Sequence, residues 1–341
     1  MSLTDLKEEV RVFDNIDKDN FSLLQEKAEI IEASCEDLYI DNLRENLKFS
    51  DYSGKFIIKN PYDDSLNNIQ KLDFSPHAIG QLCTKLGIPV RYINKCFEQG
   101  EISLVADNLN TWIEKIPKDK TLLFRQHEDR IRGVLSDKFS IFDSTSILNT
   151  LSNMGIEEEY RLKSAFLNDE RLHLRMIDPE PLDIKGEDLF AGIQIDSSDV
   201  GKSLLKVQFF IHKLVCTNGL TIKKAGGILY EQKHIGIKEE EFIEGIEEGI
   251  ELIPKIVAET RDLIINQKQI KIVSLDEWIE KIKTDLRLSE DSANNIINLY
   301  NEKYVGGSKW DLINSITEEA QRFNLDRRID IEEYAGSLLV A

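Results

Sequence analysis

The chain has 341 residues, enough for about two or three domains. Hydrophobic residues make up 41% and charged residues 31%, the balance of a folded globular protein and not of a disordered one. No apolar run approaches the roughly 20 residues of a membrane helix, and the acidic N-terminus lacks the apolar core of a secretory signal. A soluble, cytoplasmic protein with no membrane partner is therefore expected.

The net charge of −19 is spread unevenly. Residues 1–120 hold 15 Lys+Arg against 22 Asp+Glu (−7), residues 121–235 hold 15 against 17 (−2), and residues 236–341 hold 13 against 23 (−10). A protein that coats DNA by bulk positive charge would not have this composition. Any nucleic-acid surface must be local, and the near-neutral middle third is the expected place for it.

The N-terminal region, 1–120, is predicted to be mainly helical. Spaced apolar residues over 21–48 favour an amphipathic helix, and a short strand is predicted near residues 56–58. Over 75–100 the spacing matches a helix-turn-helix: Ser75 is a good N-cap, and Gly87 can end the first helix before the second begins near residue 90.

The central region, 121–236, is predicted to be a β-rich domain. The expected elements are two strands over 121–143 with a turn at 127–129, a helix over 144–154, and strands over 172–178 and 190–198. The Asn218-Gly219 pair lies between apolar runs, which predicts a type I′ hairpin turn.

The C-terminal region, 237–341, is predicted to be helical. Apolar residues recur at helical spacing from residue 242 onward, and Pro254 should kink or break that helix. Ser274, Ser289 and Ser308 are candidate N-caps of further helices. The predicted fold class is α+β, with a central antiparallel or mixed β-sheet domain flanked by helical N- and C-terminal regions.

Two sets of basic residues are candidates for binding nucleic acid. In a helix-turn-helix, the second helix would present Arg91, Tyr92 and Lys95 to DNA, although a plain helical hairpin explains the same spacing. Basic residues beside aromatic ones on a sheet are the pattern that single-strand binding uses, but acidic neighbours also fit an ordinary solvated face with salt bridges. The proposed phosphate contacts are Arg91, Lys95, Arg125, Arg130, Arg132, Lys138, Arg171, Arg175, Lys223, Lys224 and His234, with Tyr92 and Phe139 as stacking residues.

The sequence gives no sign of a catalytic site. None of the four cysteines lies in a CxxC pair, no two histidines share a helical metal spacing, and no phosphate loop or nucleophile elbow is present. No metal, no cofactor and no enzymatic activity are expected.

Several strings resemble one known family. The runs GVLSDKFSIFDSTSIL, GIQIDSSDVGKSLLKVQFFIHKLVCTNGL and EQKHIG, with GGSKWDLINSITEEAQRF near the C-terminus, look like an uncharacterised phage/plasmid-like family, a domain of unknown function, number nine-three-two. The resemblance covers roughly residues 70–340. Phe139 stands where that family usually has tyrosine, and Lys233 where it usually has arginine.

The resemblance implies a phage, prophage or plasmid protein acting near replication and recombination. The leading hypothesis is a non-catalytic DNA-binding protein that binds or anneals single-stranded DNA and forms homo-oligomers. The alternative is a module that inhibits a host defence or replication protein, with an acidic surface that mimics DNA or docks a basic partner.

Overall fold

The computed structural model describes residues 12–13, 19–61, 68–213, 218–221, 228–304 and 307–340; of these, 12–13, 19–20 and 218–221 are described by their backbone alone. The predicted fold class, α+β, is confirmed. Over the described residues the strands form one sheet of six strands and one of seven, each beside its own apolar core. No helix among these residues is long and apolar enough to cross a membrane.

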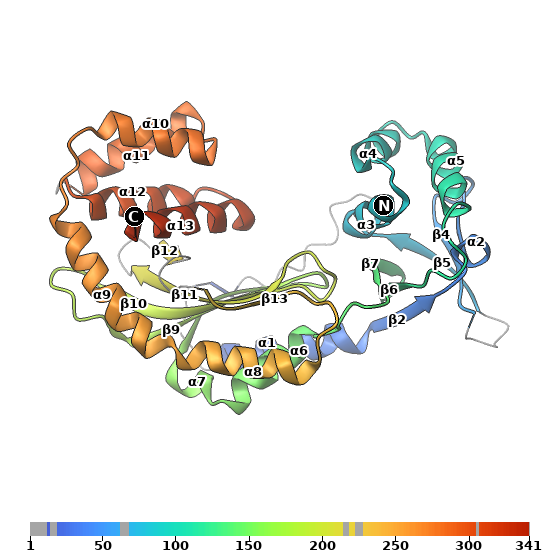
Figure 1. Cartoon of the computed structure of the whole chain (residues 1–341), viewed down its shortest axis with the longest axis horizontal. Coiled ribbons are helices and arrows are strands. Elements are labelled where there is room, and N and C mark those ends of the chain that lie inside the picture. Colours follow the sequence, from blue (N-terminus) through green and yellow to red (C-terminus); the bar gives the residue numbers. More distant parts are fainter. Residues whose placement is uncertain are drawn as a thin grey trace.

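The six-stranded sheet belongs to a lobe formed by residues 35–136, here the N-terminal lobe (Figure 1). Its neighbouring strands are antiparallel except β5 and β7, which pair in parallel through Asp73 with Arg130 and Phe74 with Ile131. The spatial order is β2 (Cys35–Ile40), β6 (Leu122–His127), β7 (Arg130–Ser136), β5 (Ile69–Phe74), β4 (Phe56–Lys59) and β3 (Leu47–Phe49).

The helices of this lobe include the pair predicted over 75–100. Ser75 caps α3 by accepting a hydrogen bond from the Ala78 N–H, and Gly87 ends it at φ +71°, a conformation that favours glycine. The helices are α2 (Leu43–Asn46), α3 (Pro76–Leu86), α4 (Val90–Glu98) and α5 (Ile102–Ile113).

The seven-stranded sheet is the floor of the molecule. It is antiparallel, and β13 pairs with β11 beside β12. Side chains alternate between its two faces: Met176, Ile193 and Phe209 belong to the apolar core, whereas Arg175 and Gln194 lie on the other face. The strands are β1 (Val12–Phe13), β8 (Arg161–Leu167), β9 (Leu172–Pro181), β10 (Leu189–Ser197), β11 (Leu205–Lys213), β12 (Asn218–Thr221) and β13 (Ile228–Gln232).

Helices cover both faces of this sheet. The helices below it in Figure 1 are α1 (Asp19–Ala33), α6 (Ser144–Asn153), α7 (Ile156–Glu159), α8 (Glu239–Glu251) and α9 (Ile253–Gln269). Those of the C-terminal lobe above it are α10 (Leu275–Leu286), α11 (Glu290–Asn298), a π-helical turn Leu299–Lys303, α12 (Lys309–Ala320) and α13 (Leu325–Leu339). The break predicted at Pro254 is present, because α8 ends at Glu251 and Pro254 lies in the first turn of α9.

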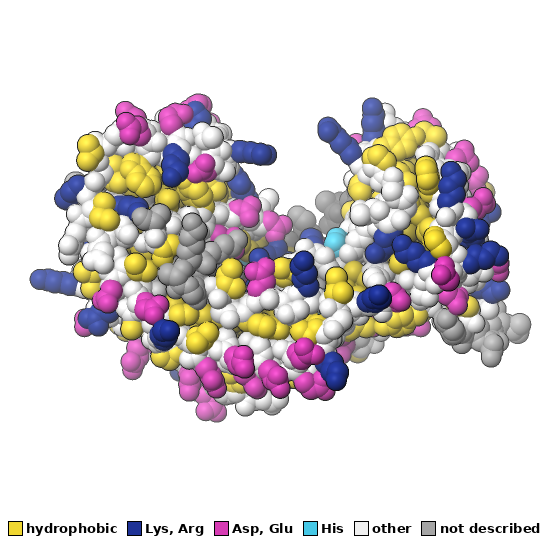
Figure 2. Space-filling model, in the orientation of Figure 1, with side chains coloured by type: hydrophobic (Ala, Val, Ile, Leu, Met, Phe, Trp, Pro, Cys, Tyr) yellow, Lys and Arg dark blue, Asp and Glu magenta, His cyan; other side chains and the backbone are white. Residues whose placement is uncertain are grey.

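The two lobes stand apart above the floor. Figure 2 shows a hollow between them, bordered in Figure 1 by α3 and α4 on one side and by the α12–α13 end of the C-terminal lobe on the other. The opposite, convex side of the molecule, at the bottom of Figure 2, is rich in acidic side chains where α7 and α8 lie. The fold therefore presents a concave side and a convex side with different charge.

Three predicted elements differ from the structure. Residues 21–48, predicted as one helix, divide into α1, β2, α2 and the start of β3, because β2 gains its hydrogen bonds from β6, far away in sequence. The strand pair β6–β7, predicted as part of the central sheet, lies in the N-terminal lobe's sheet. Asn218 and Gly219 lie in strand β12, paired with Lys213 and His212, and so do not form the predicted type I′ turn.

Candidate nucleic-acid interface

The outer face of α4 is polar, basic and open to solvent. Arg91, Tyr92, Asn94 and Lys95 are exposed, while Ile93 between them is buried in the lobe's core. Neither Arg91 nor Lys95 makes an ion pair anywhere in the described chain. This face therefore offers two cations and an exposed aromatic ring; the exposed Glu98 at the end of the same helix pairs with neither cation among the described residues.

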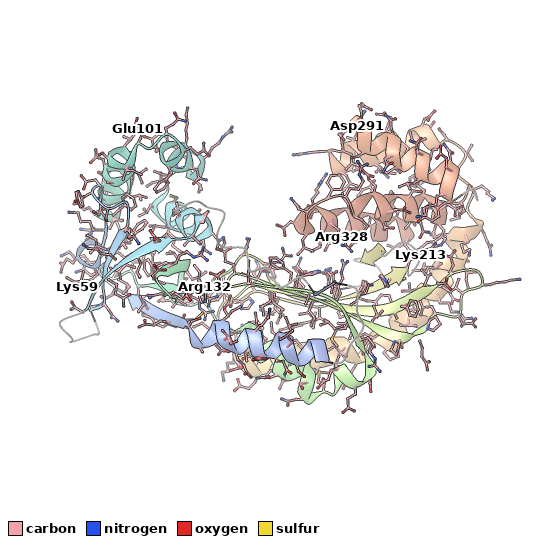
Figure 3. All side chains as sticks on the ribbon, turned by 180° about the vertical axis from the view of Figure 1, so that it is seen from behind. Lys59, Glu101, Arg132, Lys213, Asp291 and Arg328 are labelled. Atoms are coloured by element: carbon pink, nitrogen blue, oxygen red, sulfur yellow. The ribbon has the colours of Figure 1, made fainter. Side chains whose placement is uncertain are left out.

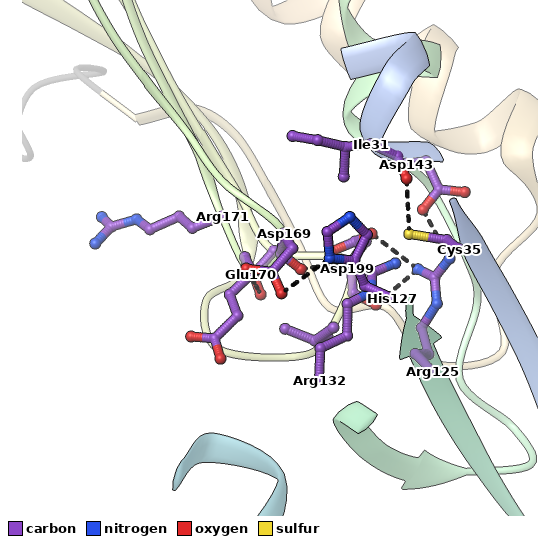
Figure 4. A network of polar contacts seen from close by, with 12 residues as sticks. Ile31, Cys35, Arg125, His127, Arg132, Asp143, Asp169, Glu170, Arg171 and Asp199 are labelled. Carbon is purple, nitrogen blue, oxygen red and sulfur yellow. Dashed lines mark hydrogen bonds and ion pairs between the residues drawn. The ribbon is translucent and has the colours of Figure 1, made fainter. Parts of the chain in front are cut away.

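Arg125, on β6, lies in the opposite environment. Its side chain is 2% exposed and is surrounded by three carboxylates: Nε is 2.7 Å from Asp37, Nη2 is 2.9 Å from Asp143, and Nη1 is 3.1 Å from Asp199. Figure 4 shows Asp143 and Asp199 beside Arg125. Nη1 also donates to the Asp199 carbonyl at 2.9 Å. Every terminal nitrogen is thus taken by the protein itself.

Arg132, on β7, is buried beside it. Its Nη1 lies 2.7 Å from Asp199 and donates to the Asp169 carbonyl at 2.6 Å. Arg130 contacts the Asp169 carboxylate at 2.5 Å. We call Asp37, Arg125, Arg132, Asp143 and Asp199 the junction network, because its members come from the N-terminal lobe and from the loops of the floor.

One nitrogen of the junction network has no hydrogen-bond partner among the described residues. Arg132 Nε and the Thr145 hydroxyl are buried without a hydrogen bond, and both residues line a cavity of about 10 Å³ together with Cys35. A cavity of this size has room for about one water, which would satisfy both groups. It is too small for a nucleotide.

The carboxylates of the network have opposite pKa shifts. Burial raises the pKa of Asp143 to about 7 in spite of Arg125, and its hydrogen bond with Asp199 adds to that shift. Burial acts in the same direction on Asp199, but the charges of Arg132 and Arg125 outweigh it and lower its pKa. The pair titrates together, with the proton held on Asp143.

A loop of the floor fits into the N-terminal lobe next to this network. The Val200 carbonyl accepts from Gln81 Nε2 at 2.8 Å and lies 3.0 Å from His77 Nε2. Gly133 leaves the space that Val200 fills, since a Cβ on Gly133 would lie 3.0 Å from Val200 Cβ. The floor and the N-terminal lobe are therefore joined by both charge and shape.

Arg171 and Arg175 lie under the C-terminal lobe. Arg175 is 2% exposed and contacts Glu332 of α13 at 2.5 Å and Gln194 at 2.8 Å. Arg171 pairs with Asp196 at 2.9 Å and with Asp326 at the start of α13. With α13 in this place, both guanidinium groups are covered by carboxylates of the protein.

The remaining predicted residues lie apart. Lys138 is exposed, but Phe139 stacks on His234, with ring centroids 5.2 Å apart and planes 5° from parallel. His234 is buried, which lowers its pKa, and its Nδ1 lies 3.1 Å from the Ser140 carbonyl. Lys223 and Lys224 lie outside the described residues.

The structure thus separates the predicted site into buried and exposed parts. Arg125, Arg130 and Arg132 come together at the junction, where carboxylates neutralise them, whereas Arg91, Tyr92 and Lys95 remain accessible on α4. The sequence analysis did not identify the acidic partners, namely Asp37, Asp143, Asp169, Asp199 and Glu332. The one feature of the sequence that pointed to these acidic partners was the near-neutral net charge of the region that holds the sheet arginines. No group of His, Cys, Asp and Glu able to hold a metal ion occurs among the described residues.

A family model described as Domain of unknown function (DUF932) matches residues 132–337. The chain belongs to this family. The DUF932 segment begins at Arg132, holds Asp143 and Asp199, and ends within α13, so it comprises the floor without β1, the junction loops and most of the C-terminal lobe. Helix α4 precedes it. No curated protein and no solved structure matches the chain.

Proposed function

We propose that this DUF932 protein binds a single strand of nucleic acid in the hollow between its lobes, in a binding and not a catalytic role. The observation that carries the proposal is α4, which borders the hollow in Figure 1 and exposes Arg91, Tyr92 and Lys95, of which Arg91 and Lys95 have no ion pair within the described residues. Cations that contact phosphates, with an aromatic ring for base stacking, are what single-strand binding requires.

The distribution of the other charges supports this placement. Arg322, between α12 and α13 on the opposite side of the hollow, has a side chain that is 62% exposed although it contacts Glu319. Lys202 on the floor loop is 43% exposed although it pairs with Glu170 at 3.1 Å. Arg328, near the same end of α13 (Figure 3), is held by Glu332 at 2.9 Å and so is not one of the exposed cations. The acidic side chains of α7 and α8 lie on the side of the molecule opposite the hollow, so they repel a nucleic acid from the convex side and favour its binding in the hollow.

The proposal retains single-stranded DNA as the expected ligand and a role in phage or plasmid recombination or replication in the cytoplasm. It assigns phosphate contact to exposed cations only. Arg125, Arg132, Arg171 and Arg175 then have structural roles, because each is held by carboxylates that a phosphate would have to displace.

Fluorescence anisotropy with a labelled oligothymidine tests the proposal. Binding should weaken with salt, with a slope of about 0.7 per phosphate contact in log–log form. The double variant Arg91→Gln/Lys95→Gln should bind more weakly and lower that slope by about 1.4. The matched control is Lys48→Gln/Lys59→Gln, two exposed lysines on strands β3 and β4, with Lys59 on the outer side of the lobe (Figure 3). If the unmodified protein fails to bind at low salt, the proposal is wrong.

A second candidate, a module that binds a basic host protein, rests on α8. This helix exposes Glu244, Glu247 and Glu248 on the convex face. Under that function, changing these three residues to glutamine would abolish capture of the host protein and leave oligonucleotide binding unchanged.

A further inference from the structure

An open cavity of about 450 Å³ lies on the N-terminal lobe, between α3, the first residue of α4 and strand β7. Pockets for small ligands commonly occupy about 300–1,000 Å³. The lining of this cavity comes largely from α3, which borders the hollow in Figure 1, and includes Val90, the first residue of α4. Its lining residues are Pro76, His77, Gly80, Gln81, Thr84, Lys85, Val90, Val134 and Leu135.

The cavity contains one cation without a counter-charge. Lys85 is half-buried and makes no ion pair in the described chain. Burial lowers its pKa, and the nearby positive charge of Lys120 lowers it further. Lys85 and Lys120 therefore repel each other, and an anion bound beside Lys85 would relieve that repulsion.

The remaining walls are apolar or already engaged. Val90 supplies partly exposed apolar surface and Leu135, 6% exposed, adds a little, whereas Val134 is fully buried. Gly80 leaves room in the cavity, since a Cβ there would have only Val90 Cγ1 within 4 Å, at 3.7 Å. Polar groups are occupied: the Thr84 hydroxyl donates to the Gly80 carbonyl, and Gln81 spans from the Val134 N–H to the Val200 carbonyl. Such a wall can contact the flat face of a nucleic-acid base, but its occupied polar groups do not distinguish one base from another.

We propose that this cavity holds one nucleotide unit of the bound strand, with its base against Val90 and Leu135 and its phosphate at Lys85. The inference rests on the proposed function and extends it, since Val90 begins the helix whose next exposed residues are Arg91 and Tyr92. The strand would pass from the α4 face into the cavity, with no preference among bases.

Saturation-transfer NMR of thymidine monophosphate with the full-length protein tests the cavity directly. The base protons should receive saturation from the protein, and Lys85→Gln, which removes the charge at nearly constant size, should weaken binding about tenfold. Gly80→Leu, which fills the cavity, should abolish the signal. Lys59→Gln is the control and should have no effect. Oligothymidine anisotropy is measured on the same samples, and circular dichroism checks that each variant is folded; should Gly80→Leu not fold, Lys85→Gln alone decides.

The outcomes separate the cavity from the proposed function. Salt-sensitive oligonucleotide binding that is unchanged in Lys85→Gln, with no saturation of the monophosphate, would overturn the inference and leave the proposed function standing. Inorganic phosphate that competes as well as the monophosphate would overturn the placement of the base. Binding of the monophosphate without any binding of the oligonucleotide would overturn the proposed function and, with it, the strand as the ligand.

Discussion

Arg125 holds a full charge where water is excluded, and the protein accommodates it with three carboxylates. Burial alone would lower its pKa, but the charges of Asp199, Asp143 and Asp37 raise it, so the guanidinium stays protonated. A buried charge of this kind is costly to leave unpaired, and the cost of losing one partner exceeds what the pairs contribute to stability.

We therefore expect Arg125→Met to destabilise the protein by about 3–5 kcal/mol, because it leaves Asp37, Asp143 and Asp199 without their shared partner. Urea unfolding followed by circular dichroism measures the change. The matched control is Arg91→Met, an exposed residue without an ion pair in the described chain, for which the change should stay within about 0.5 kcal/mol. A similar small loss at Arg125 would show that the network is not formed as described.

Asp143 gives the stability a pH dependence. Its folded pKa of about 7 lies above the unfolded value, so the folded state binds the extra proton between these two values. The stabilisation is complete below about pH 4 and is lost as the pH rises through about 7. Relative to Asp143→Asn, the unmodified protein should lose up to about 1.4 kcal/mol per pH unit within that window and nothing further above it. Unfolding free energies measured from pH 4 to 9 would contradict this if the difference stayed flat.

At this scale the sequence predicted which residues carry positive charge but not whether they are accessible. Arg125 and Arg91 look alike in sequence, each beside apolar and aromatic neighbours. What separates them is Asp143 and Asp199, which reach Arg125 only because the floor's loops fold against β6. Such contacts between distant segments cannot be read from local spacing.

At the scale of the elements, the loop that carries Val200 can pack against β7 only because residue 133 is a glycine. A Cβ at position 133 would lie 3.0 Å from Val200 Cβ, so Gly133→Ala should cost about 1–3 kcal/mol of unfolding free energy. Adding Val200→Ala should recover part of that loss, and a double-mutant cycle measures the coupling. Gly80→Ala is the control: its nearest neighbour lies at 3.7 Å within a helix, so the protein should be unchanged or up to about 1 kcal/mol more stable.

Local signals predicted individual elements well where caps and turns determine them. Ser75, Gly87, Ser289 and Ser308 all act as expected, while Ser274 precedes its helix without a side-chain cap bond. The pairing of elements was predicted less well. The parallel pairing of β5 with β7 places β6 and β7 in the first sheet. This pairing follows a long connection through α3, α4, α5 and β6, and local spacing does not encode which strands pair across such a connection.

For the molecule as a whole, the junction network and Val200 tie the two sheets into one structure. We expect a single unfolding transition for both halves, because neither can open without exposing the buried charges of Arg125 and Asp199. Tryptophan fluorescence can report each half, since Trp112 lies on α5 of the N-terminal lobe and Trp278 and Trp310 lie in the C-terminal lobe. A variant that keeps only Trp112 and a variant that keeps only Trp278 and Trp310 should give urea unfolding curves, followed by fluorescence, that coincide.

Asp199→Ala should separate these curves, because it removes the carboxylate that both arginines share. Two transitions in the unmodified protein would contradict the coupling, and so would curves that stay coincident after the substitution.

The route of the chain also sets the order in which the molecule can be completed during synthesis. Strand β1 pairs with β8, with Phe13 opposite Ser164, and α1 packs against α6, so the whole N-terminal lobe is inserted between partners of one sheet. At roughly 5–20 residues per second, a ribosome needs about 8–30 s to make the intervening 150 or so residues. The apolar core of the N-terminal lobe is made during that delay, but Asp143 and Asp199, which neutralise its buried arginines, follow it, and β1 can pair only once its partner strand β8 is made.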